Sequence, residues 1–286
     1  VAILQGFVRN QGDAWKYSLE AFDQFLMRCR AQRTGQEHAL IPTGALTEKG
    51  QKNVPALARE LIGPYLDSAA RIGQRTGELH NALANVHDNP DFTPEPFSSE
   101  YRQSRFASMC RLVSHTCSLL KGRLNSLPSE REREARRVVN DEPRILNRFR
   151  DFLELESRAL WIRCHGDYHL GQVLWTGQDF LISDFEGEPD RPLSERRMKH
   201  TPIVDVAGML RSFYYVPYAA LSRRQSHFLA EESGGRLEPW IRFWYGWVSL
   251  VFWKSYLGIV KRASFWPESQ VEVQVLLDAH LLEKVV

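Results

Sequence analysis

Three side chains that can bind a metal or accept a proton lie close together near the middle of the chain. Gln172 follows Asp167 by five residues, and Asp184 follows Asp167 by seventeen. Carboxylate and amide oxygens are ligands that Mg²⁺ accepts, and a carboxylate can also take the proton of an attacking hydroxyl. These residue types therefore point to phosphoryl transfer, which needs charge neutralisation on the phosphate oxygens and a group that orients the nucleophile.

The spacing of these residues is that of a catalytic loop followed by a metal-binding loop. In protein kinases a base Asp and a metal-binding Asn are five residues apart, and an Asp-Phe-Gly follows the next strand. Asp167 and Gln172 keep this spacing, and the run from Asp184 to Gly187 takes the place of Asp-Phe-Gly. We expect Asp167 to be catalytic, and Gln172 and Asp184 to hold Mg²⁺ at the phosphates of ATP. The alternative, in which both carboxylates only stabilise turns, is disfavoured by the combined spacing.

A β-hairpin must position these groups. Residues 172–175 and 180–183 have the apolar content of short strands, and Thr176-Gly-Gln-Asp179 is typical of a turn. Such a hairpin would hold Asp167 and Gln172 at one end and bring Asp184 beside them.

The same residues carry a family resemblance. The runs at 165–174 (His-Gly-Asp-Tyr-His-Leu-Gly-Gln-Val-Leu), 184–189 (Asp-Phe-Glu-Gly-Glu-Pro), 195–197 and 205–213 resemble bacterial maltokinases. More particularly, they are similar to the kinase part of trehalose synthase/maltokinase fusion proteins. This resemblance implies an aminoglycoside-phosphotransferase-like fold, ATP and Mg²⁺ as cofactors, and conversion of maltose to maltose 1-phosphate in trehalose-to-glycogen metabolism. It also implies a fused or associated trehalose synthase.

Two further residues receive supporting roles. By resemblance Asp205 supports the backbone of the catalytic loop, although from the sequence alone it is also a plausible helix N-cap. Val204 stands where the family tends to carry a basic residue, which weakens an ion-pair role there. We expect His165 to fix the loop through hydrogen bonds rather than to act as the base.

Residues that contact the acceptor are harder to identify. Glu186 and Arg196 are candidates because they follow the metal-binding loop, and Tyr256 is one because sugars stack on aromatic rings. Tyr256 belongs to an aromatic-rich helix predicted for residues 240–260. For any single ring of this helix, core packing is the favoured interpretation.

Length, charge and cysteine content narrow the class of protein. The chain has 286 residues, 43% hydrophobic and 25% charged, as in a soluble globular protein. With 37 basic and 35 acidic residues, its charge does not favour a nucleic-acid or membrane partner. Its four cysteines lack Cys-x-x-Cys spacing, and no apolar run is long enough to span a bilayer. We expect a cytoplasmic protein with reduced thiols.

The remaining pattern predicts an α+β fold that is mostly helical: the larger, C-terminal lobe of a kinase-like fold, with its only β element at the catalytic site. Residues 1–30 are expected to form the end of the ATP-side lobe and the hinge, and residues 31–286 a helical catalytic lobe. No Gly-rich loop or strand lysine precedes the hinge, and the chain begins with Val. We therefore expect a fragment that lacks most of the N-terminal lobe, is truncated at its C-terminus, and could be inactive by itself. Helices are predicted at residues 15–30, 54–62, 66–86, 98–127, 129–139, 143–157, 206–215, 240–260 and 268–286.

Two other functions remain open. The same carboxylates would serve phosphorylation of an aminoglycoside, choline or homoserine, although the basic stretch 191–199 disfavours a polycationic aminoglycoside. The chain could instead be a non-catalytic kinase-like module fused to trehalose synthase. The presence of all three catalytic oxygens argues against this second reading.

Overall fold

A computed structural model of the chain describes residues 6–32, 41–42, 44–48, 53–86, 88–223 and 237–285. The sequence predicts a strand at residues 1–8 and a polar loop at residues 31–53. Residues 1–5 and most of residues 31–53 lie outside the described part. Residues 6–8 are not in a strand.

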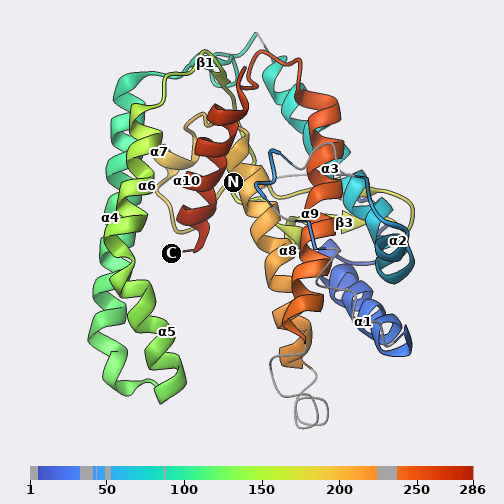
Figure 1. Ribbon diagram of the computed structural model, residues 1–286. Helices are drawn as coiled ribbons and strands as arrows, with labels where there is room; N and C mark the ends of the chain where they lie inside the picture. The colour runs from blue at the N-terminus through green and yellow to red at the C-terminus, as the bar shows by residue number, and fades with distance from the viewer. Residues whose placement is uncertain are drawn as a thin grey trace.

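Helices make up most of the described chain, as expected (Figure 1). The α-helices are α1 (Ala14–Gln32), α2 (Ala56–Ile62), α3 (Tyr65–Ala84), α4 (Ser99–Arg123), α5 (Ser129–Asn140), α6 (Glu142–Glu154), α7 (Leu193–Arg196), α8 (Ile203–Arg223), α9 (Glu238–Val260) and α10 (Gln270–Val285). Two 3₁₀ turns are η3 (Leu124–Ser126) and η4 (Leu170–Gln172). The strands form two antiparallel pairs, β1 (Glu95–Pro96) with β2 (Leu160–Trp161), and β3 (Val173–Trp175) with β4 (Phe180–Ile182).

The core lies where α9 packs along α3 and against α1. The rings of Tyr65 on α3 and Trp244 on α9 stack at 5.4 Å, and Phe22 of α1 meets Trp244 edge-on. Trp244 and Trp253 are almost completely buried. The aromatic residues of α9 therefore form the core, as their helical spacing predicted.

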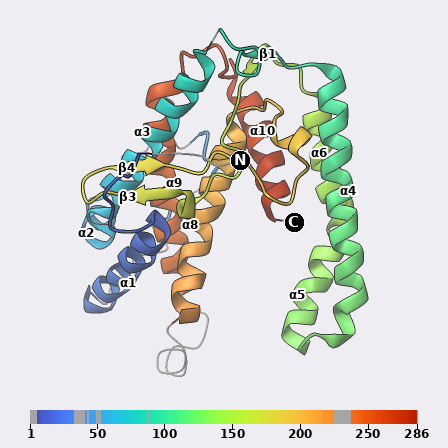
Figure 2. The same cartoon turned by 180° about the vertical axis from the view of Figure 1, so that it is seen from behind.

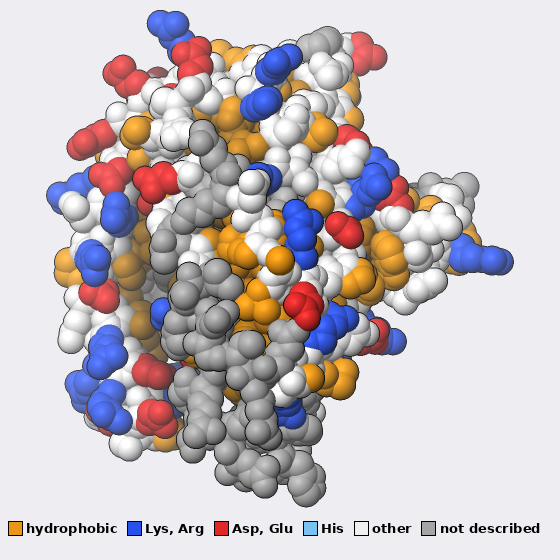
Figure 3. All heavy atoms as spheres, turned by 45° about the vertical axis from the view of Figure 1, so that its right-hand side comes forward, with side chains coloured by type: hydrophobic (Ala, Val, Ile, Leu, Met, Phe, Trp, Pro, Cys, Tyr) orange, Lys and Arg blue, Asp and Glu red, His pale blue; other side chains and the backbone are white. Residues whose placement is uncertain are grey.

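Helices α4, α5 and α6 form an arm on one side of the molecule, and α10 lies between this arm and α8 (Figures 1 and 2). The alternating charges of α5 pair along the helix, for example Arg136 with Glu132 at 2.7 Å. This helix therefore presents a solvated, charged face. On the face shown in Figure 3, basic and acidic side chains are likewise interspersed. No helix within the described ranges is long and apolar enough to cross a membrane.

Three local features differ from the sequence-based expectations. The short helix α7 forms inside the basic stretch 191–199, where no helix was predicted, and it follows Pro192, whose fixed φ suits a helix start. Strands β1 and β2 pair although Pro96 lies in one of them, because this two-residue strand is an edge. Helix α8 begins at Ile203, so Asp205 lies inside its first turn.

Candidate active site

The β3–β4 hairpin brings Gln172 and Asp184 to the same end. Val173 pairs with Ile182, and the backbone N–H of Ser183 donates to the carbonyl of Gln172 at 2.9 Å. The Ser183 hydroxyl donates to the same carbonyl at 3.1 Å. Asp184 therefore leaves the hairpin directly beside Gln172.

The His-Gly-Asp turn is attached to this end of the hairpin. Nε2 of His165 hydrogen-bonds the carbonyl of Ser183 at 2.8 Å, and the His165 ring lies 5.0 Å from that of Phe185. An ideal Cβ on Gly166, which has φ 86°, would lie 3.5 Å from the Cα of Gly187. The turn that carries Asp167 and the loop that begins with Asp184 thus pack against each other. His165 makes the loop-fixing contact expected of it.

Asp205 lies beneath the turn and is 1% exposed. Its carboxylate accepts hydrogen bonds from the backbone N–H groups of His165 at 2.8 Å and Gly166 at 2.9 Å, and it contacts Nε2 of His80 at 3.1 Å. It does not cap its own helix, because its oxygens point at the loop. The alternative in which Asp205 serves only as a helix N-cap is therefore wrong.

Helix α8 approaches the loop closely enough for these bonds because residue 208 is glycine. A Cβ at Gly208 would lie 2.4 Å from the carbonyl oxygen of Tyr168, well inside van der Waals contact. One turn further, the Ser212 hydroxyl accepts from the N–H of Leu170 at 3.1 Å. The loop therefore rests along one side of α8.

The buried carboxylate of Asp205 remains ionised. Burial raises its pKa, but the hydrogen bond to His80 and those from the loop backbone outweigh burial and lower the pKa below its usual value. His80 is fully buried, and its other ring nitrogen bonds Tyr256 at 2.9 Å. His80 is therefore a hydrogen-bonded residue of the core.

Asp167 is accessible, with 25% of its side chain exposed. Its pKa is lowered, chiefly by contact with His169, whose Nε2 lies 3.8 Å from Oδ2 of Asp167, and further by the charge of Lys284. The carboxylate is therefore ionised at neutral pH, the form that can accept a proton.

The side chains of Gln172 and Asp184 carry amide and carboxylate oxygens, the ligand types that Mg²⁺ accepts. Asp184 is exposed and adopts φ 65°, a left-handed conformation that is uncommon outside glycine and clusters at functional sites. No group of three or more His, Cys, Asp or Glu side chains able to hold a metal occurs among the described residues. Mg²⁺ needs no such cage, because it commonly binds one or two protein oxygens together with substrate phosphates and water.

The three candidate acceptor contacts have different surroundings. Glu186 is exposed, with no hydrogen bond or ion pair to another described residue. Arg196 donates from Nε to the carbonyl of Arg191 and from Nη2 to that of Pro189, both at 2.8 Å, so its guanidinium holds its own loop. Tyr256 is fully buried and bonds His80. Tyr256 cannot contact an acceptor in this structure, which corrects its candidate role.

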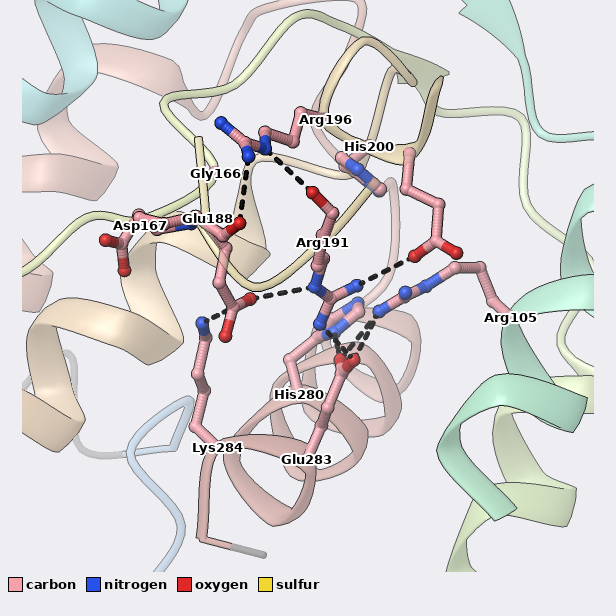
Figure 4. A network of polar contacts seen from close by, with 12 residues as sticks. Arg105, Gly166, Asp167, Glu188, Arg191, Arg196, His200, His280, Glu283 and Lys284 are labelled. Atoms are coloured by element: carbon pink, nitrogen blue, oxygen red, sulfur yellow. Dashed lines mark hydrogen bonds and ion pairs between the residues drawn. The ribbon is translucent and has the colours of Figure 1, made fainter. Parts of the chain in front are cut away.

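A polar network joins the loop after Asp184 to α10 and α4 (Figure 4). Nη2 of Arg105 reaches both oxygens of Glu283 at 2.6 and 2.7 Å, and Arg191 bonds Glu283 at 3.0 Å. Arg191 also bonds Glu188 at 2.8 Å, and Lys284 lies 3.5 Å from Glu188. Within this loop, the charge of Arg191 is therefore paired with two carboxylates of the protein.

Sequence reasoning missed two residues that lower the pKa of Asp167. His169 lies two positions after it in the same turn, a spacing that could have drawn attention. Lys284 is more than one hundred residues away, and only the packing of α10 brings it near. No local pattern could have identified Lys284.

Comparisons with known proteins give local sequence similarity and a shared fold. No protein-family model matches the chain. A glucosamine kinase of Mycolicibacterium smegmatis (strain ATCC 700084 / mc(2)155) is 46% identical over 57 residues, 20% of this chain and 14% of that protein. A glucosamine kinase of Streptacidiphilus jiangxiensis is 32% identical over 83 residues, 29% of this chain and 19% of that protein.

Solved structures of glucosamine kinase match almost the whole chain. One, in complex with glucosamine, ADP and inorganic phosphate, has a TM-score of 0.63 at 20% identity and covers 96% of this chain. A second crystal form has a TM-score of 0.61 and covers 99%. This chain spans about half of their length, 54% and 53%. The chain therefore has the fold of the matched half of a glucosamine kinase, which confirms the kinase-like architecture. Assignment to one lobe stays a prediction.

Proposed function

We propose that this chain carries the acceptor-side catalytic machinery of an ATP-dependent sugar kinase. The observation that carries the proposal is the packing of the His-Gly-Asp turn against the end of the β3–β4 hairpin, which groups Asp167, Gln172 and Asp184. The sequence similarity to glucosamine kinases and the shared fold support this reading.

In the proposed mechanism Asp167 orients the acceptor hydroxyl and takes its proton as the hydroxyl oxygen attacks the γ-phosphorus of ATP. The bond from the γ-phosphorus to the β,γ-bridging oxygen breaks, and ADP leaves. Because its pKa is lowered, Asp167 is charged before the acceptor arrives. Gln172 and Asp184 would hold Mg²⁺, which neutralises charge on the phosphate oxygens.

The acceptor that the relatives favour is an amino sugar such as glucosamine. The basic stretch 191–199 argued against cationic acceptors, but its side chains Arg191 and Arg196 are bound to acidic groups and carbonyls of the protein. Glu186 is exposed in the loop after Asp184 and could meet an ammonium group. An amino sugar is thus electrostatically compatible with this site.

Maltose is the second candidate, because the motifs of residues 165–213 resemble maltokinases. Its product would be maltose 1-phosphate, and the resemblance also implies a fused or associated trehalose synthase. Choline, homoserine and aminoglycosides lack a comparable observation in their favour.

The test is an acceptor panel with ATP and Mg²⁺, using the complete gene product that contains this sequence. Glucosamine, maltose, glucose and kanamycin are compared, and products are assigned by mass and by phosphorus–proton NMR coupling. Phosphorylation of glucosamine or maltose, lost on removal of Mg²⁺, is the expected result. Nucleotide binding without transfer to any sugar would favour a non-catalytic module instead.

A further inference from the structure

The imidazole of His169 is fixed on one side by its own turn. Its Nδ1 accepts a hydrogen bond from the backbone N–H of Gly171 at 3.0 Å, and His169 is the N-cap of η4. A nitrogen that accepts this bond carries no proton, so the neutral ring carries its proton on Nε2. The backbone thereby selects the tautomer that presents an N–H at the far edge of the ring.

That edge faces the proposed base. Nε2 of His169 lies 3.8 Å from Oδ2 of Asp167, and 43% of the His169 side chain is exposed. The distance is too long for a hydrogen bond in the absence of substrate, but catalytic contacts often shorten only in the reactive complex.

The turn is shaped around the ring. A Cβ at Gly171 would lie 2.8 Å from Cε1 and 3.0 Å from Nδ1 of His169. Such a side chain would displace the ring from its position beside Asp167. The glycine at 171 is thus required for this arrangement.

We propose that His169 is a positioning residue: its Nε2–H holds Oδ2 of Asp167, so that Oδ1 is left to face the acceptor hydroxyl. The inference rests on the proposed phosphotransferase function, in which Asp167 is the base. The less specific reading is that His169 only caps η4 through Nδ1. The two readings assign importance to different nitrogens of one ring, so they can be separated.

Two substitutions of His169 separate the role of Nδ1 from that of Nε2. The Asn amide in His169→Asn can place an acceptor near the position of Nδ1 and keep the cap, but it does not reach Asp167. The longer amide in His169→Gln can place an N–H near the position of Nε2, but it loses the cap. Both are compared with wild type and Asp167→Asn in the complete gene product, by steady-state kinetics with ATP and the best acceptor, and by thermal unfolding.

We expect His169→Asn to unfold like wild type while its kcat falls by about 10- to 100-fold with KM for ATP little changed. His169→Gln should recover most of the lost turnover despite a lower Tm. Wild-type kcat in His169→Asn, with loss of Tm and turnover together in His169→Gln, would overturn the proposal in favour of the cap. If Asp167→Asn also kept full activity, the proposed function itself would fail, a result distinct from failure of the His169 inference alone.

Discussion

At the scale of single residues, the arrangement of the site depends most on Asp205. Its buried carboxylate binds two backbone N–H groups of the His-Gly-Asp turn and one nitrogen of His80. Backbone N–H groups that lose a buried partner carry an unrecovered desolvation cost. Asp205 therefore contributes both to stability and to the conformation that presents Asp167.

We expect Asp205→Ala to lower the free energy of unfolding by about 3–5 kcal/mol, because it removes the charged partner of a buried network. Asp205→Asn should cost less, since its amide oxygen can still accept one loop hydrogen bond. Urea denaturation measures both. The matched control is Asp190→Ala at an exposed aspartate, expected within about 0.5 kcal/mol of wild type. Equal effects of Asp205→Ala and the control would contradict the supporting role.

The catalytic and metal-binding roles of Asp167, Gln172 and Asp184 stay predictions from the sequence, where the three residues share one short segment. The structure adds the hydrogen bonds that Asp205 and His165 make to the turn and the hairpin. From the sequence, the supporting role of Asp205 rested on the family resemblance alone. Tyr256 shows that residue type alone does not identify a substrate contact. An aromatic ring suits either a sugar or a core, and burial decides between them only in three dimensions.

At the scale of elements, α10 holds the loop that follows Asp184. Burial would raise the pKa of Glu283, but the hydrogen bond to His280 and the charges of Arg105 and Arg191 outweigh it and hold the pKa well below its usual range. Glu283 thereby joins α10 to α4 and to the loop that contains Glu188. The position of this loop therefore depends on Glu283 staying ionised.

Replacing Glu283 by Ala should destabilise the protein by about 3–5 kcal/mol, because Arg105 would remain buried without its carboxylate. The substitution should also loosen residues 188–196, which hydrogen exchange can follow by mass spectrometry. Glu268→Ala at an exposed position is the control, with little expected change. Unchanged exchange of residues 188–196 in Glu283→Ala would contradict this role of α10.

Near Glu283, the buried His200 makes the free energy of unfolding depend on pH. Burial, followed by the positive charges of Arg105, His280 and Arg191, lowers its pKa to about 3, and Glu283 only partly opposes this. An unfolded histidine takes up a proton below about pH 6.5, while folded His200 stays neutral down to about pH 3. Between these values the unfolded state binds more protons, so stability is lost as pH falls.

Replacing His200 by Asn removes this titration while keeping a group that can hydrogen-bond the Tyr101 hydroxyl. The slope of unfolding free energy against pH should decrease between pH 6 and pH 5 by about 1 kcal/mol per pH unit. Denaturant titrations of both proteins at each pH measure the slope. Parallel profiles for His200→Asn and wild type would rule out this contribution.

Most long helices were predictable because their apolar periodicity and end signals agree, as in α1, α3 and α9. The start of α8 was not, since residues 203–205 could equally belong to the loop before it. The β1–β2 pair was missed because two-residue strands carry no periodic pattern. Its partners also lie far apart in the sequence, so only tertiary packing could reveal it.

At the scale of the whole molecule, the expected mostly helical, kinase-like fold is confirmed by its match to solved glucosamine kinases. The division into an end of the ATP-side lobe at residues 1–30 and a catalytic lobe from residue 31 remains a prediction. Charge placement could not be predicted from composition. The basic stretch 191–199 looked like a cationic surface, whereas the fold directs Arg191 at Glu188 and Glu283, and Arg196 at nearby carbonyls.

The central claim is that Asp167 supports transfer of the γ-phosphoryl group of ATP to a sugar hydroxyl. The most direct measurement follows the label from γ-³²P ATP into the sugar in a single turnover, with wild type and Asp167→Asn in the complete gene product. The account predicts labelled sugar phosphate in the wild type and a rate at least about 10²-fold lower in the variant, with nucleotide binding retained. Label transfer at equal rates in both proteins would contradict it.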